Sequence, residues 1–325
     1  MSCFTSKKIF GIFALVSLAG LVALADYFPH SLEPRFGSTK LTDDLENSLT
    51  MFRDGSIGGP FIYRVLIPWL GISFIDLFET SAVIVFSIGN FIFSFTALLS
   101  MYFFAKNVKS TLVTLGSIFG LTLYMLFTQA QFQGITFVET QDALNLAVFL
   151  LGLSLLKNRS LWWLAILITL SIFNRESALF LLIPMAYFSW KEKNWMPTIF
   201  ATLGGISTYL ILRLWIGNSG NDDWIWFDKI SKNIPGLVAA DWNIALKSNI
   251  LVALYFSPLI ALFLAGSRKI ATFYKPVLLM SVLFIVVHYI VGTVMELRLF
   301  LPIIGILLPL AIENFEVKKH SENQK

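Results

Sequence analysis

The sequence predicts an all-α protein that crosses a membrane about ten times. Hydrophobic residues make up 56% of the 325 residues and charged residues only 14%, whereas a soluble domain carries about 25% charged residues. The apolar residues fall into runs that approach the length of a membrane-spanning helix, about 20 residues. Lysines gather in alternate connections between these runs, as basic residues do on the cytoplasmic side. Both chain ends are therefore expected inside.

One membrane-embedded domain, residues 1–325, accounts for the whole chain, because spans and short loops leave no room for a separate soluble domain. A single cysteine and three scattered histidines exclude a disulfide framework and a histidine-based metal site. The net charge of +4 reflects topology, since the basic residues lie in short loops rather than on one soluble face. A lipid bilayer is the expected partner, and nucleic acid is not.

The first element is the apolar run at residues 9–25, which follows Lys7 and Lys8. It is either a first membrane helix or a secretory signal, because residues 23–25 resemble a cleavage site. We favour an uncleaved anchor. Both alternatives place residues 26–79 outside, as a first extracytoplasmic loop rich in acidic residues.

The second element, at residues 61–78, is predicted to lie in the outer interface rather than to cross. Arg64 and Pro68 near its start, and Asp76 and Glu79 near its end, make it a poor span. If it crossed, every later loop would change sides, and the lysines would then collect outside.

The later apolar runs alternate in direction, with lysines at each inner turn and a second extracytoplasmic loop at residues 218–248. They are predicted at residues 80–105, 110–128, 142–156, 160–173, 177–190, 195–217, 249–265, 276–292 and 299–314.

Arginines follow a different distribution from lysines. Most are predicted outside or at outer helix ends, where the topology rule disfavours them: Arg35, Arg53, Arg64, Arg175, Arg213 and Arg298. The planar guanidinium suits phosphate and carboxylate. An anionic ligand on the outer face is the simplest functional interpretation.

Arg175 and Glu176 interrupt the apolar stretch at residues 160–190, which is too short for two comfortable spans. Charges at that depth are tolerated in protein or in a wet cavity. The alternatives are a functional break and a plain turn closed by an Arg175–Glu176 pair.

Two further places carry acids near this depth. Glu296 and Arg298 precede the last span and either pair with each other in a hairpin or reach across a cleft. Asp142 is predicted to open a span, sharing a helical face with Asn145. Asp142 is either a site residue or a cap favoured by the helix dipole.

In the first outer loop, Asp43 and Asp44 precede Tyr63 and Arg64 by about twenty residues, so both groups can face one cleft. A carboxylate here suits a general base for an acceptor hydroxyl. Asp44 with Glu46 is also a minimal carboxylate pair for a divalent cation, although the general-base role needs fewer assumptions. Tryptophans in the second outer loop fit an interfacial belt or a surface for stacking on a sugar.

These features together resemble the GT-C class of bacterial integral-membrane glycosyltransferases. The resemblance rests on the acid pair, the segment PFIYRVLIPWL, Asp142 at the start of a span, NRES between short spans and ELRLFLP before the last one. It implies transfer of a sugar from a polyprenyl-phosphate donor on the extracytoplasmic face of the cell membrane, in building the cell envelope.

The resemblance also implies roles for individual residues. Asp44, or its neighbour Asp43, matches the catalytic base. Arg64, Arg175 and Arg298 are candidates for holding the donor phosphate, and the remaining substrate-binding candidates are Tyr63, Asp142, Glu176 and Glu296.

A different class is a transporter or flippase for an anionic lipid or sugar, since transporters also build sites at broken helices. Alternating access needs polar groups reachable from both sides, whereas the ionisable residues here cluster in the predicted outer half. The sequence therefore favours an enzyme. A non-catalytic assembly subunit would not need buried acid–arginine pairs.

Overall fold

The computed structural model describes residues 14–23, 38–54, 65–106, 110–131, 136–216, 233, 242–265, 272–291 and 297–322. All the regular structure in these ranges is helical. Four of their helices are long and apolar enough to cross a membrane: Ala82–Lys106, Thr111–Thr128, Leu246–Leu264 and Leu297–Phe315. Several shorter apolar helices accompany them. The prediction of an all-α fold is therefore confirmed for the described residues, and four of their helices have the length and composition of membrane spans.

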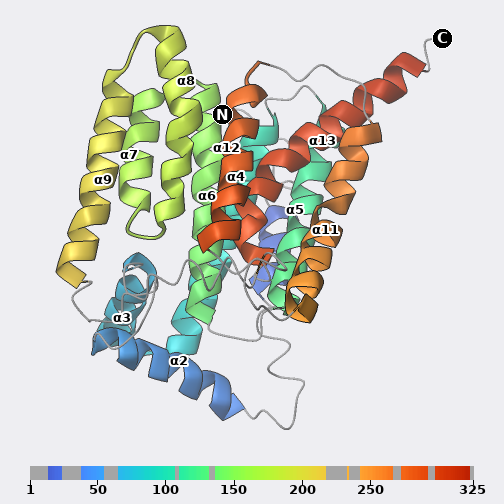
Figure 1. The fold of residues 1–325 in the computed structure, drawn as a ribbon. Coiled ribbons are helices and arrows are strands. Elements are labelled where there is room, and N and C mark those ends of the chain that lie inside the picture. The colour runs from blue at the N-terminus through green and yellow to red at the C-terminus, as the bar shows by residue number, and fades with distance from the viewer. Residues whose placement is uncertain are drawn as a thin grey trace, which may run out of the picture.

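Most helices overlap the predicted apolar runs, with several ends shifted along the chain, and Figure 1 shows their arrangement. In chain order after the helix at Ala14–Ala23, they are α2 (Ser38–Arg53), α3 (Leu66–Phe78), α4 (Ala82–Lys106), α5 (Thr111–Gln131), α6 (Thr136–Lys157), α7 (Leu161–Ser171), the 3₁₀ helix η2 (Glu176–Leu181), α8 (Leu182–Glu192), α9 (Met196–Ile216), α11 (Trp242–Ala265), α12 (Tyr274–Val291), the 3₁₀ helix η3 (Leu297–Phe300) and α13 (Leu301–Glu322).

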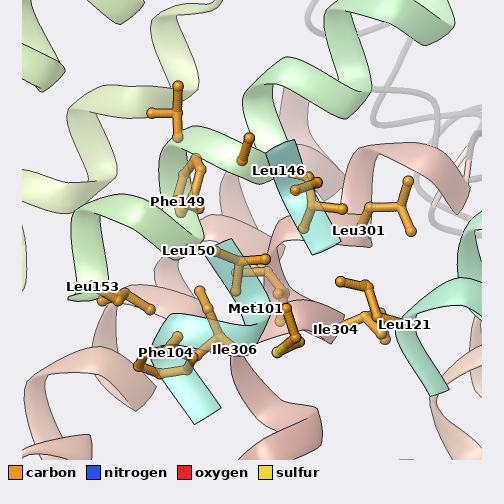
Figure 2. Close-up of a cluster of buried hydrophobic side chains, with 14 of the residues drawn as sticks. Met101, Phe104, Leu121, Leu146, Phe149, Leu150, Leu153, Leu301, Ile304 and Ile306 are labelled. Atoms are coloured by element: carbon orange, nitrogen blue, oxygen red, sulfur yellow. The ribbon is translucent and has the colours of Figure 1, made fainter. Parts of the chain in front are cut away.

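The centre of the bundle is apolar and lies between α4, α6 and α13. Figure 2 shows Met101 and Phe104 of α4 facing Leu150 of α6 and Ile304 of α13, all of them buried. The packing is close at Gly305, where an added Cβ would lie 3.0 Å from Leu146 Cδ1. This core packs α6, which carries Asp142, against α13, which directly follows the 3₁₀ helix that carries Arg298.

Helix α3 confirms a helical segment within residues 61–78, and it is short. Its 13 residues extend about 20 Å, less than the ~30 Å hydrocarbon core of a bilayer. One face is buried at Ile67 and Gly71, where a Cβ on Gly71 would meet the Phe86 ring of α4 at 2.3 Å. The opposite face exposes large apolar residues, including Trp69 and Leu77.

Helix α2 was not expected, because residues 26–60 were predicted as an extracytoplasmic loop without a helix of its own. Leu45, Leu49 and Phe52 repeat at helical spacing and pack on Ile67 of α3 and Phe86 of α4. Figure 1 shows α2 and α3 at one end of the bundle, with α2 lying across it. An exposed ion pair of 2.7 Å joins the two helices, from Arg53 Nη2 to Asp76 Oδ1.

The second predicted loop, residues 218–248, is corrected at its end, since α11 already begins at Trp242. Between α9 and α11 the structure describes one residue, Asn233, and its side chain is buried. Its Nδ2 donates to Tyr289 O at 2.8 Å, Asn249 Nδ2 donates to Asn233 O at 2.8 Å, and Tyr289 Oη donates to Asn249 Oδ1 at 3.1 Å. The ring of bonds ties this point of the chain to α11 and α12.

Candidate functional site

The predicted break at residues 173–177 is a tight turn between α7 and η2. Helix α7 ends at Ser171, whose carbonyl oxygen accepts hydrogen bonds from Asn174 N at 2.9 Å and from Arg175 N at 2.8 Å. Arg175 then has an extended backbone (φ −155°, ψ 134°), and η2 begins at Glu176. Arg175 therefore links two short helices through an extended backbone, and its charged side chain is buried in the bundle.

Arg175 and Arg298 converge on one carboxylate, that of Asp142 in α6. Arg175 Nη2 lies 2.5 Å from Asp142 Oδ1, and Arg298 Nη1 donates to Asp142 Oδ2 at 3.1 Å. The exposed fractions of the three side chains are only 3%, 6% and 4%, in the order Arg175, Arg298 and Asp142. Charges so far from water persist where they are paired. Three segments distant in the sequence therefore form one buried ionic cluster.

Two hydrogen bonds hold the turn against α6 on either side of this cluster. Asn174 Nδ2 donates to the backbone oxygen of Gln141 at 3.1 Å. Ser177 Oγ donates to Asn145 Oδ1 at 3.1 Å. All four residues are buried. The contacts set the position of Arg175 relative to Asp142 from both directions along the chain.

The start of α3 also reaches this turn, because Leu66 N donates to Phe173 O at 3.0 Å. Tyr63 and Arg64, which precede Leu66 by three and two residues, lie outside the described residues. The structure therefore brings the α3 segment to the Arg175 turn without testing the roles predicted for Tyr63 and Arg64.

Asp142 was predicted to open its helix, and this prediction is wrong. Helix α6 begins at Thr136, so Asp142 lies in its second turn. A cap at the helix N-terminus is thereby excluded. Of the two alternatives for the turn, a functional break and a turn closed by an Arg175–Glu176 pair, the structure supports the first in one respect, because Arg175 contacts Asp142 of another helix. Glu176 is half-buried at the start of η2 and has interactions of its own.

The remaining predicted site residues are placed only in part. Glu296, the acid predicted beside Arg298, lies outside the described residues. Asp43 and Asp44 belong to α2, but only their backbone is described. Glu46 of the same helix is exposed. Among the described side chains, no group of three histidine, cysteine, aspartate or glutamate residues could hold a metal ion.

One histidine lies close to η3 and was not among the predicted site residues. His288 of α12 stacks on Phe284, with ring centroids 4.0 Å apart, and its ring lies 6.2 Å from that of Phe300. Its Nδ1 donates to Phe284 O at 2.8 Å, because a carbonyl oxygen can only accept. A single histidine inside an apolar run gives no pattern that would single it out.

Comparison with protein-family models, with curated proteins and with solved structures finds no match to this chain.

Proposed function

We propose that this protein is a membrane glycosyltransferase that takes a sugar from a polyprenyl-phosphate donor. The observation that supports this proposal most directly is the convergence of Arg175 and Arg298 on the buried carboxylate of Asp142. Guanidinium groups bind phosphate through parallel, charge-assisted hydrogen bonds. A donor phosphate is the anion that such a site would bind at the edge of a membrane.

In this proposal, Asp142 orients the two guanidinium groups and the donor phosphate binds beside it. Both arginines make interactions in addition to those with Asp142. A guanidinium carries five N–H donors, so it can contact a carboxylate and a phosphate together. Arg64, two residues before the Leu66 contact with this turn, is proposed as a third phosphate ligand.

The proposal places this site on the extracytoplasmic side of the cell membrane, within ten spans and with both chain ends inside. Lys157, at the end of α6, lies fifteen residues beyond Asp142, or about 22 Å along the helix axis. Basic residues favour the cytoplasmic side, so the Asp142 end of α6 would face outward. Helix α3 would then lie in the outer interface, with its exposed apolar face toward lipid.

Asp44 is proposed as the general base. The acceptor hydroxyl oxygen attacks the anomeric carbon of the sugar, the bond from that carbon to the phosphate oxygen breaks, and polyprenyl phosphate leaves. The proton of the hydroxyl passes to the carboxylate.

The base is tested by Asp44→Asn and Asp43→Asn in the purified protein. We expect Asp44→Asn to retain donor binding and to abolish transfer, because asparagine cannot accept the proton. Loss of turnover only in Asp43→Asn would move the role by one residue. Full activity in both variants would refute a catalytic base in α2.

Donor binding is tested by Arg175→Lys and Arg298→Lys. Lysine retains the charge and loses the fork, and a charge-assisted bond is worth about 1.5–3 kcal/mol, so we expect roughly a tenfold to hundredfold weaker affinity for polyprenyl phosphate. The matched control is Arg159→Lys, because Arg159 forms an exposed pair with Glu192 at 2.9 Å. Unchanged affinity in both folded site variants would refute the anionic-donor site.

The break between the short helices α7 and α8, which contains the Arg175 turn and η2, favours a second candidate function. This function is a transporter or flippase for an anionic lipid or sugar, because transporters build sites at broken helices. Protein reconstituted in sealed vesicles distinguishes the two functions. Movement of polyprenyl-phosphate sugar across the bilayer without any change in the sugar linkage would favour the transporter.

A further inference from the structure

Asn174 has an amide oxygen that the protein itself does not use. The side chain is only 1% exposed. Its nitrogen Nδ2 donates to Gln141 O at 3.1 Å. Within the described part of the chain, the other end of the amide, Oδ1, has no hydrogen-bond partner. A buried acceptor without a donor costs about 1–3 kcal/mol, and such atoms in native proteins commonly face a ligand or a water.

The orientation of this amide follows from its neighbour. Gln141 O is a backbone carbonyl and can only accept, so the Asn174 nitrogen has to face it. A flipped amide would place two oxygens 3.1 Å apart. Oδ1 is therefore the end of the amide directed away from Gln141.

Asn174 directly precedes Arg175, a member of the ionic cluster. Residues 174 and 175 contact residues 141 and 142 of α6 in the same order: Asn174 with Gln141, then Arg175 with Asp142. An acceptor of neutral charge thus lies in the same turn as a guanidinium group. Guanidinium groups recognise an anion, whereas a neutral oxygen acceptor recognises a hydroxyl or amide donor.

We propose that Asn174 Oδ1 accepts a hydrogen bond from a hydroxyl group of the sugar, while Arg175 and Arg298 hold the phosphate to which that sugar is linked. The inference rests on the proposed function and adds a residue that senses the sugar itself. It predicts that the site discriminates between a sugar-bearing lipid phosphate and the bare lipid phosphate.

The test compares how two kinds of probe bind the purified full-length protein. The first is polyprenyl phosphate without a sugar, and the second is polyprenyl phosphate linked to glucose, mannose or galactose. The quantity of interest is the sugar preference, defined as the Kd for the bare lipid phosphate divided by the Kd for the tightest hexose form. We expect a preference above one in the wild type and a three- to tenfold smaller preference in Asn174→Ala, the loss typical of one hydrogen bond.

Ser177→Ala is the matched control, because Ser177 also holds the turn to α6, through Asn145. This variant removes one hydrogen bond between the turn and α6 and leaves Asn174 Oδ1 in place. We expect it to retain the wild-type sugar preference. Equal losses of preference in both variants would show that the turn merely needs to be held, and would overturn the assignment of Asn174.

The outcomes separate this inference from the proposed function. If the wild type binds neither probe, the proposed function fails. If it binds both probes equally, or if Asn174→Ala retains the full preference, Oδ1 faces a buried water and this inference alone fails. Should Asn174→Ala not fold, Asn174→Leu provides the same comparison with a side chain of similar shape that has no acceptor, and an undiminished preference there would again contradict the assignment.

Discussion

Neutralising Asp142 is expected to destabilise the protein strongly, because it leaves two guanidinium groups buried without their shared carboxylate. Asp142→Asn preserves the shape of the side chain and removes its charge. Arg175 and Arg298 are only 3% and 6% exposed, so water does not replace the lost partner. Removing one member of a buried ion pair costs about 3–5 kcal/mol. We expect a loss of at least that size in the free energy of unfolding.

The measurement is reversible unfolding of the detergent-solubilised protein, followed by circular dichroism, with size-exclusion chromatography to confirm a folded starting state. Glu192→Gln is the control, since the Arg159–Glu192 pair is 45% and 32% exposed and an exposed pair contributes about 0–1 kcal/mol. An Asp142→Asn variant no less stable than Glu192→Gln would refute the description of Asp142 as the centre of a buried ionic cluster.

Two further predictions concern packing and topology. Gly71→Leu should cost about 1–3 kcal/mol of stability, because a Cβ there would lie 2.3 Å from Phe86. Leu77→Ala on the exposed face of α3 should be nearly neutral in detergent, and equal effects of the two variants would contradict the packing of α3 on α4. Reporters inserted after Lys109 and Lys193 should be cytoplasmic, and one within residues 218–232 should be extracytoplasmic. The inverted pattern would mean that residues 61–78 cross the membrane.

Much of the fold could be predicted from the sequence, because a helix in lipid satisfies its own backbone and reveals itself as an apolar run. The break at Arg175 was also predictable, since charge and polar residues interrupt such a run. The contact of Arg175 with Asp142 was not. Local sequence favours the adjacent Glu176, whereas the observed partner lies 33 residues away. Only the register between α6 and the turn after α7, fixed by packing, brings the two together.

Helix α2 shows a second limit of the sequence. Only five of its sixteen residues are apolar, and charged and polar residues lie between most of them, so the segment resembles a soluble loop. Its helical form is supported by packing on α3 and α4, and most helical stability in proteins comes from such tertiary contacts. The side chains of Asp43 and Asp44 depend on the placement of this helix, and their predicted role stays a prediction.

The cluster of Asp142, Arg175 and Arg298 can be retained for stability or for chemistry, and one variant separates the two. A buried ion pair seldom stabilises a protein more than neutral groups of the same shape, because desolvation offsets the attraction. The triple variant Asp142→Asn, Arg175→Gln, Arg298→Gln removes every charge of the cluster together. We expect it to regain most of the stability lost in Asp142→Asn, ending within about 2 kcal/mol of the wild type, yet to bind no polyprenyl phosphate. A stable triple variant that still binds the lipid phosphate would show that these charges do not hold the donor. A triple variant as unstable as the sum of its single substitutions would show that the three residues do not act as one cluster.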